Sequence, residues 1–157
     1  MGIASRILVP LDGSVLSESA IPLAISLARA QPTNYIFVSF ARSNSGETGL
    51  SEGQSHNRTE SDEITTYLDK IAGQYPEISP TLIVGAGDAA TEIERAADEQ
   101  GADLVVIASR GRSGMVRGLL GSVTGRLLQI SRCPILVTHP GVEELRVADS
   151  HSLSSLI

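Results

Sequence analysis

The sequence predicts an α/β fold: an open, five-stranded parallel sheet with helices on both faces. Two observations lead to this prediction. Five short apolar runs are nearly continuous rather than alternating, which is typical of parallel strands buried on both faces. Segments with apolar residues at helical spacing lie between these runs, and such regular alternation of strand and helix favours a parallel sheet.

The expected strands and helices alternate along the chain. The strands are expected at residues 6–10, 35–40, 81–84, 103–108 and 134–138. The helices are expected at about 20–28, 60–75, 89–100 and 122–132, whereas the polar residues 43–59 predict a long loop. In such a sheet, ligands bind beyond the carboxyl ends of the strands, where the strand order reverses. The loops that follow the strands therefore carry the candidate site.

Length and composition narrow the class of protein. With 157 residues, 41% of them hydrophobic, the chain forms one packed domain, expected at 1–140 and followed by a polar tail at 141–157. A net charge of −6 and an aromatic content of 3% argue against a nucleic-acid partner. No apolar run approaches the ~20 residues of a membrane span. The single cysteine, Cys133, fits a reducing compartment, so we expect a cytoplasmic protein.

Positive charge gathers in one segment. Residues 104–142 contain five arginines and no Asp or Glu, which leaves −11 for the remainder of the chain. A locally cationic segment in an acidic protein suggests a small anionic ligand. Solvated arginines, with carboxylate partners elsewhere in the fold, would give the same pattern, and charge alone does not decide between the two interpretations.

The turn after the first expected strand carries Asp12, followed by Gly13 and Ser14. A carboxylate at the end of a strand can accept hydrogen bonds from a ribose hydroxyl or help to hold a metal ion. The same three residue types are common in turns and helix caps, so a purely structural role is the alternative.

The segment after the fourth expected strand is rich in glycine and arginine. Residues 109–122 hold four glycines, three arginines and serines at both ends. Glycine lets a backbone approach a ligand closely, and the start of a helix at Gly121-Ser122 offers free N–H groups that favour phosphate. The segment therefore predicts a phosphate-binding loop, although Ser122 could simply cap the helix.

With these residues the chain resembles the universal stress protein family. The strongest match is the family's nucleotide loop, G-2x-G-9x-G-[ST], which here starts at Ala108 and continues through Gly111 to Gly121 and Ser122. Residues 7–14, 84–89, 101–106 and 133–137 match in the same order, so the resemblance covers about residues 5–139. It implies a Rossmann-like fold and a homodimer joined through the last strand, from about Pro134 to Thr138.

The resemblance also implies a role for each site residue. Asp12 would face the ribose, with Pro10, Leu11 and Phe40 around the adenine. Ile107 and Ala108 would approach the base and the sugar. The remaining candidate nucleotide-binding residues, most of them placed around the phosphates, are Gly111, Arg112, Gly121, Ser122, Val123 and Thr124.

The implied function is a dimeric stress-response regulator that binds ATP or another adenine nucleotide, which Mg²⁺ can accompany. A dimeric scaffold without nucleotide is the alternative, because Ala108 replaces the first glycine of the motif and Phe40 is bulkier than the usual aliphatic residue. We expect no catalysis beyond slow ATP hydrolysis, since no general base or water-positioning residue is evident.

Overall fold

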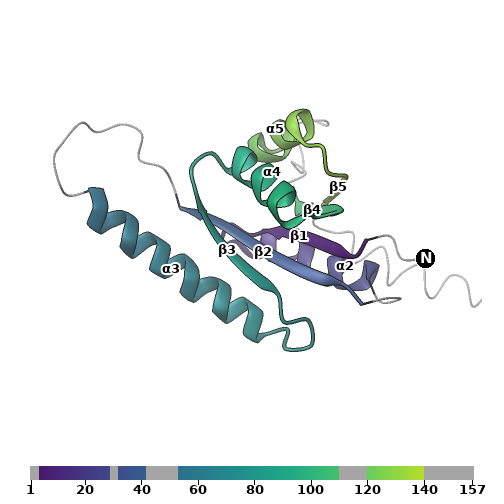
Figure 1. Cartoon of the computed structure of the whole chain (residues 1–157), viewed down its shortest axis with the longest axis horizontal. Helices are drawn as coiled ribbons and strands as arrows, with labels where there is room; N and C mark the ends of the chain where they lie inside the picture. The colour runs from purple at the N-terminus through teal and green to yellow at the C-terminus, as the bar shows by residue number, and fades with distance from the viewer. Residues whose placement is uncertain (1–3, 29–31, 42–52, 110–119, 140–157) are drawn as a thin grey trace, which may run out of the picture.

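The computed structural model describes residues 4–28, 32–41, 53–109 and 120–139 (Figure 1). It confirms the predicted fold class, a five-stranded parallel sheet with helices on both faces. The strands are β1 (Arg6–Pro10), β2 (Asn34–Ala41), β3 (Thr81–Ala86), β4 (Leu104–Ala108) and β5 (Ile135–Thr138). The helices are α1 (Val15–Glu18), α2 (Ala20–Leu27), α3 (Gly53–Gly73), α4 (Ala89–Gln100) and α5 (Ser122–Ile130).

The order of the strands places a reversal at the centre of the sheet. The order is β3-β2-β1-β4-β5, so the chain first moves outward from β1 to β3 and then returns to β4 on the other side of β1. β1 and β4 pair directly, with Ile7 opposite Leu104 and Leu8 opposite Val105. The helices that follow these two strands leave toward opposite faces, which opens a crevice at their carboxyl ends.

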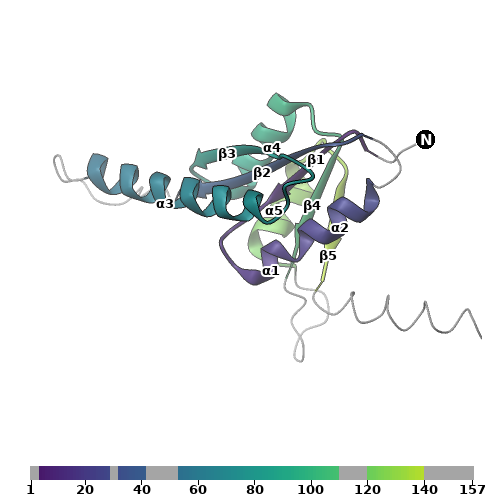
Figure 2. The same cartoon turned by 90° about the horizontal axis from the view of Figure 1, so that it is seen from below.

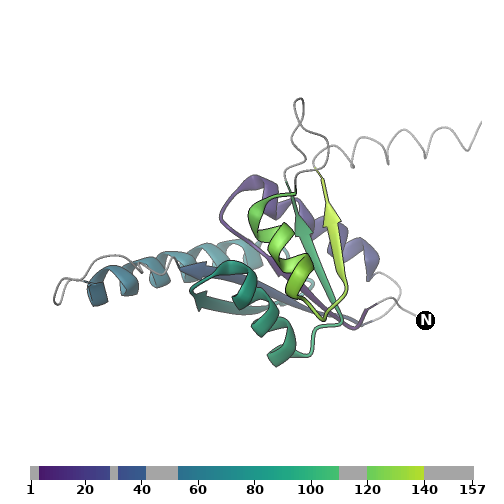
Figure 3. The ribbon, with the colours of Figure 1, turned by 90° about the horizontal axis from the view of Figure 1, so that it is seen from above.

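Successive residues of the central strands supply two separate cores. Ile7 and Val9 of β1 pack with α2 and α3 on one face, whereas Leu8 packs with α4 and α5 on the other. Figure 2 shows α1, α2 and α3 in front of the sheet, and Figure 3, from the opposite side, shows α4 and α5 in front. Burial on both faces explains why the strand sequences are continuously apolar.

The helix boundaries differ from the prediction in two places. α2 matches the first expected helix, with Pro22 in its first turn, where a missing N–H costs little, but the short helix α1 before it was not predicted. α3 begins at Gly53, inside the segment predicted to be a loop; residues 42–52 of that segment lie outside the described residues. The first turns of α3 run beyond the sheet (Figures 1 and 2), and their polar sequence lacks the apolar periodicity that reveals a packed helix. None of the helices in the described ranges is both long and apolar enough to cross a membrane.

Candidate functional site

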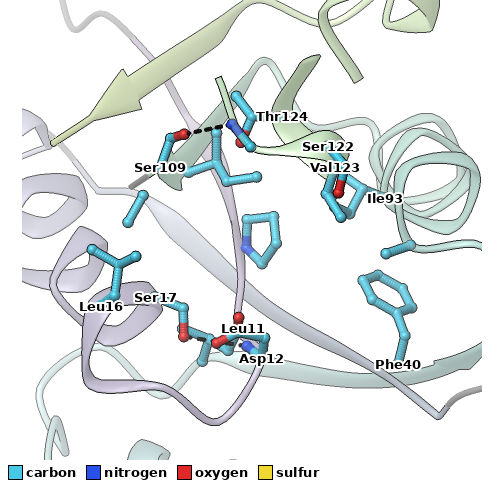
Figure 4. A pocket seen from close by; sticks show the side chains of 15 residues that line it. Leu11, Asp12, Leu16, Ser17, Phe40, Ile93, Ser109, Ser122, Val123 and Thr124 are labelled. Atoms are coloured by element: carbon cyan, nitrogen blue, oxygen red, sulfur yellow. Dashed lines mark hydrogen bonds between the residues drawn. The ribbon is translucent and has the colours of Figure 1, made fainter. Parts of the chain in front are cut away.

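A pocket of about 250 Å³ lies at the carboxyl ends of β1 and β4, where the strand order reverses (Figure 4). Of the twelve predicted site residues, ten line this pocket: Pro10, Leu11, Asp12, Phe40, Ile107, Ala108, Gly121, Ser122, Val123 and Thr124. The other two, Gly111 and Arg112, lie outside the described residues. The fold therefore brings together residues that are more than one hundred positions apart in the sequence, and their role in binding a nucleotide remains a prediction.

Sequence reasoning missed five further lining residues: Leu16, Ser17, Ala89, Ile93 and Ser109. Ala89 and Ile93 lie four residues apart on α4, a spacing that identifies one helix face but does not say whether that face covers a core or a pocket. Ser109 directly follows β4, so its position beyond a strand end was the signal that could have identified it.

The loop that carries Asp12 is held by its own hydrogen bonds. The Ser14 backbone N–H and hydroxyl both donate to Asp12 Oδ1, and the Asp12 N–H donates to Ser17 Oγ over 3.2 Å. Ser14 is the N-cap of α1, because its Oγ accepts from the Ser17 N–H at 3.1 Å. Gly13 has a φ of 83°, a left-handed conformation that glycine adopts without strain. The expected turn is therefore present, with Ser14 rather than Asp12 as the cap.

The Asp12 carboxylate is charged at neutral pH. Burial raises its pKa, but the hydrogen bonds from the Ser14 side chain and backbone and from Ser17 outweigh burial, so the pKa lies below its ordinary value of 3.8. A carboxylate has about four lone-pair sites, so it can accept further bonds from a ligand in addition to those from Ser14. Asp12 is thus a fixed, charged acceptor at the edge of the pocket.

Tyr67 of α3 supports the same loop from the other side of α1. Its hydroxyl donates to Glu18 Oε1 over 3.0 Å, which joins α3 to the end of α1. Burial and the neighbouring Glu18 carboxylate raise the pKa of Tyr67, so the hydroxyl keeps its proton throughout the physiological range. α3 therefore holds α1, which follows the Asp12 loop, although none of the described side chains of α3 lines the pocket.

The start of α5 has no side-chain cap among the described residues. Gly121 is the N-cap residue, and its own N–H donates to Ser109 Oγ over 3.3 Å. Ser122, Val123 and Thr124 form the first turn and line the pocket. The first N–H groups of a helix have no acceptor within the helix and carry its positive dipole end. This end of the pocket therefore offers donors to an anion.

Beside α5, the start of α4 is capped. Asp88 Oδ2 accepts from the Thr91 N–H at 3.0 Å and from the Thr91 hydroxyl at 2.7 Å, so Asp88 is the N-cap of α4. The other Asp88 oxygen forms an ion pair with Arg126 of α5 at 3.2 Å. One arginine of the cationic segment thus has a carboxylate partner; Arg110, Arg112 and Arg117 lie outside the described residues.

The remaining wall of the pocket is apolar. Phe40 points toward Ile93 and lies across the pocket from Leu16 and Ser17 (Figure 4). Ala108 lies in the regular part of β4, and the only described non-glycine residue with a positive φ is Ser79, so the alanine adds a methyl group without backbone strain. Apolar walls with a few placed polar groups are typical of small-molecule sites.

Ionisable side chains are scarce around the pocket. Asp12 is the one ionisable residue among the described lining residues. The described ranges contain no group of three or more His, Cys, Asp or Glu side chains that could hold a metal ion. The arrangement can therefore bind an apolar ring, hydroxyl groups and an anion around one pocket.

Comparison with known proteins gives consistent matches over nearly the whole described chain. A sequence model of the Universal stress protein family matches residues 4–139. Universal stress protein YxiE of Bacillus subtilis is 31% identical over 144 residues, covering 85% of this chain and 97% of YxiE. The structure of hypothetical protein MJ0577 superposes with a TM-score of 0.72 at 22% identity, over 87% of this chain and 96% of that protein. A universal stress protein in complex with cAMP gives a TM-score of 0.56 at 21% identity, over 88% and 98% of the two chains.

Proposed function

The chain belongs to the universal stress protein family, and from that premise we propose that its pocket binds an adenine nucleotide and that occupancy of the pocket regulates a stress response. One observation carries the proposal: an apolar wall, a charged acceptor and an uncapped helix start lie around one pocket at the reversal of strand order. A solved universal stress protein holds cAMP, which supports the same class of ligand.

Different lining residues suit the base, the ribose and the phosphates of a nucleotide. Phe40, Ile93 and Ile107 provide apolar surface for the base. Asp12 can accept hydrogen bonds from ribose hydroxyls, since it is charged and held in place by Ser14. A volume of about 250 Å³ lies just below the ~300–1,000 Å³ typical of ligand pockets, which suits a base and a ribose inside with the phosphates outward.

The phosphates are expected at the start of α5. The free N–H groups of its first turn and the helix dipole favour a negative group there. Where Mg²⁺ accompanies the nucleotide, Asp12 and the hydroxyls of Ser122 and Thr124 are lining oxygens of the type that this ion prefers. We propose binding rather than turnover, with ATP hydrolysis slow at most, because the described lining residues hold no side chain placed as a base for an attacking water.

We also propose that the protein acts as a homodimer in the cytoplasm, joined through β5. β5 is an edge strand; Pro134 O accepts from the Val105 N–H of β4, and Thr138 O accepts from the N–H of Ser109, the residue after β4. Backbone groups alternate along a strand, so those of Ile135 and Val137 are directed to the open edge. Val137→Pro, which removes an outward N–H and spares the bonds to β4, should convert dimers to monomers in light scattering. A wild-type monomer would contradict the proposal.

The proposed ligand can be tested on the protein as purified. The protein is isolated without added nucleotide, denatured, and its supernatant separated by anion exchange with detection at the adenine absorbance. We expect an adenine nucleotide near one per chain, or a rise in melting temperature when ATP, ADP, AMP or cAMP is added. No peak and no rise with any of the four would favour the scaffold alternative. Recovery of binding in Ala108→Gly would then identify the added methyl as the cause.

A further inference from the structure

Gly85 of β3 lies beside the pocket but does not line it. It belongs to the segment 84–89, which matches the family and to which the proposed function assigns no role. Phe40 of β2 is its direct partner in the parallel pairing. Directly paired residues of neighbouring strands project to the same face, so both positions belong to the face that α4 and α5 cover, where Phe40 packs.

The Phe40 ring occupies the space that a side chain at position 85 would need. A Cβ on Gly85 would lie 2.6 Å from Phe40 Cδ1 and 2.9 Å from Cε1, distances that real Cβ atoms do not show. Glu92 Oε2 would be 3.2 Å away. Gly85 does not have a positive φ, so the requirement for glycine concerns space and not backbone conformation.

The ring has one direction in which it can move. Gly85 lies under it, and Ala89 and Ile93 of α4 line the pocket beside it. The opposite side of the ring faces the pocket, which Phe40 also lines (Figure 4). A methyl group on β3 would therefore push the ring into the space that the ligand needs.

We propose that Gly85 is a specificity-determining residue that acts through Phe40. Because it has no side chain, the Phe40 ring lies back against β3 and leaves room for a planar heterocyclic base beside the aromatic surface, where stacking favours such rings. The identity of the ligand rests on the proposed function, whereas the steric relation between the two residues does not. The class of ligand recognised at this wall is a purine rather than a smaller ring.

The binding test is a double-mutant cycle. Gly85→Ala should weaken ATP binding about tenfold, the usual size of an overpacking effect in a fitted site, and should weaken UTP binding less because a pyrimidine is smaller. In the Phe40→Leu background, the same alanine should change affinity less than about twofold, since the ring is gone. Glu92 is present in both backgrounds, so an effect of the alanine on Glu92 would appear equally in both. A difference between the backgrounds is therefore due to the Phe40 ring. Gly73→Ala, at a position with open space around the added Cβ, is the matched control.

A second readout needs no ligand. The chain has two phenylalanines, so ring-labelled phenylalanine gives two separable NMR signals. In Gly85→Ala the Phe40 signal should move and the Phe37 signal should stay. An unmoved Phe40 signal, or an equal loss of ATP affinity with and without the ring, would overturn the inference. Failure of the wild-type protein to bind any nucleotide would overturn the proposed function. The NMR result would still decide whether a side chain at position 85 displaces the Phe40 ring.

Folding of the variants is informative too. If Gly85→Ala does not fold but gains a cooperative melt when Phe40→Leu is added, the clash with the ring is established directly. If Phe40→Leu folds and the double variant does not, the methyl collides with something other than the ring, and the inference is wrong.

Discussion

α4 and α5 start side by side at the pocket, yet the backbone N–H groups of their first turns are capped differently. Both helices carry threonine at the third position, Thr91 in α4 and Thr124 in α5. In α4 the residue before the helix is Asp88, whose carboxylate accepts from Thr91. In α5 that residue is Gly121, and no side chain among the described residues caps the turn.

The difference separates a structural helix start from one that is open to a ligand. A capped end has satisfied donors and a negative charge, both of which oppose an incoming phosphate. An uncapped end leaves donors that water or an anion must satisfy. The pocket thus has one helix start closed by the protein itself and one that the proposed ligand would complete.

Giving α5 the cap of α4 should have the largest effect. Gly121 has φ −55° and ψ 153°, and an added Cβ would be 3.7 Å from Ser109 Oγ, so Gly121→Asp fits without strain. The new carboxylate should raise the melting temperature by only about 1 °C, because aspartate exceeds glycine as an N-cap by a few tenths of a kcal/mol, yet it should weaken ATP binding roughly hundredfold through lost donors and repulsion. Calorimetry and titration measure the two effects. Gly125→Ala in the same helix is the control, with a rise in stability and unchanged affinity.

Asp12→Asn tests whether the Asp12 carboxylate binds the ribose rather than the phosphates. Asparagine keeps an acceptor for Ser14 but loses the charge, so affinity should fall about tenfold, equally for ATP and AMP. The loss for Gly121→Asp should instead grow with the number of phosphates. Because the pKa of Asp12 lies below 3.8, the ratio of wild-type to variant affinity should be constant between about pH 5 and 8, where the phosphate of the ligand titrates equally for both proteins, and should fall below the ordinary pKa of Asp12. Asp12 acting on phosphate would give unequal losses.

Removing the cap of α4 should affect stability and spare the pocket. Asp88→Ala should lower the melting temperature by about 3 °C and leave nucleotide affinity unchanged. The hydrogen bonds from the Thr91 side chain and backbone hold the pKa of Asp88 below 3.8. Its contribution is therefore complete above that pH and is lost as the pH falls through the lowered pKa. Melting curves of variant and wild type should converge in acid; a constant difference would show that the carboxylate is not responsible.

Tyr67→Phe should have the smallest effect. It removes the bond to Glu18, and Tyr67 itself does not line the pocket, so affinity for ATP should fall about threefold or less. The preference for ATP over its 2′-deoxy form should fall with it, because the Asp12 loop is held less firmly. Tyr35→Phe, at the far end of β2, is the matched control and should change neither quantity.

Local sequence patterns predicted most of the fold. All five strands were predicted with boundaries within two residues, because strands buried on both faces are continuously apolar. The alternation of elements predicted the parallel sheet, and the turns after the strands predicted where a pocket would form. The first turns of α3 were not predicted because their sequence is polar and has no periodic apolar pattern.

The sequence by itself determined the strands, the turn after β1, and the glycine before α5. Only the tertiary structure decided that Phe40 lies against Gly85, that Ser14 rather than Asp12 caps α1, and that Tyr67 of α3 bonds to Glu18. The physical reason is the distance along the sequence over which each interaction acts. Helix and strand periods are properties of neighbouring residues, whereas the fit of a ring over a missing side chain depends on the register between strands forty-five positions apart.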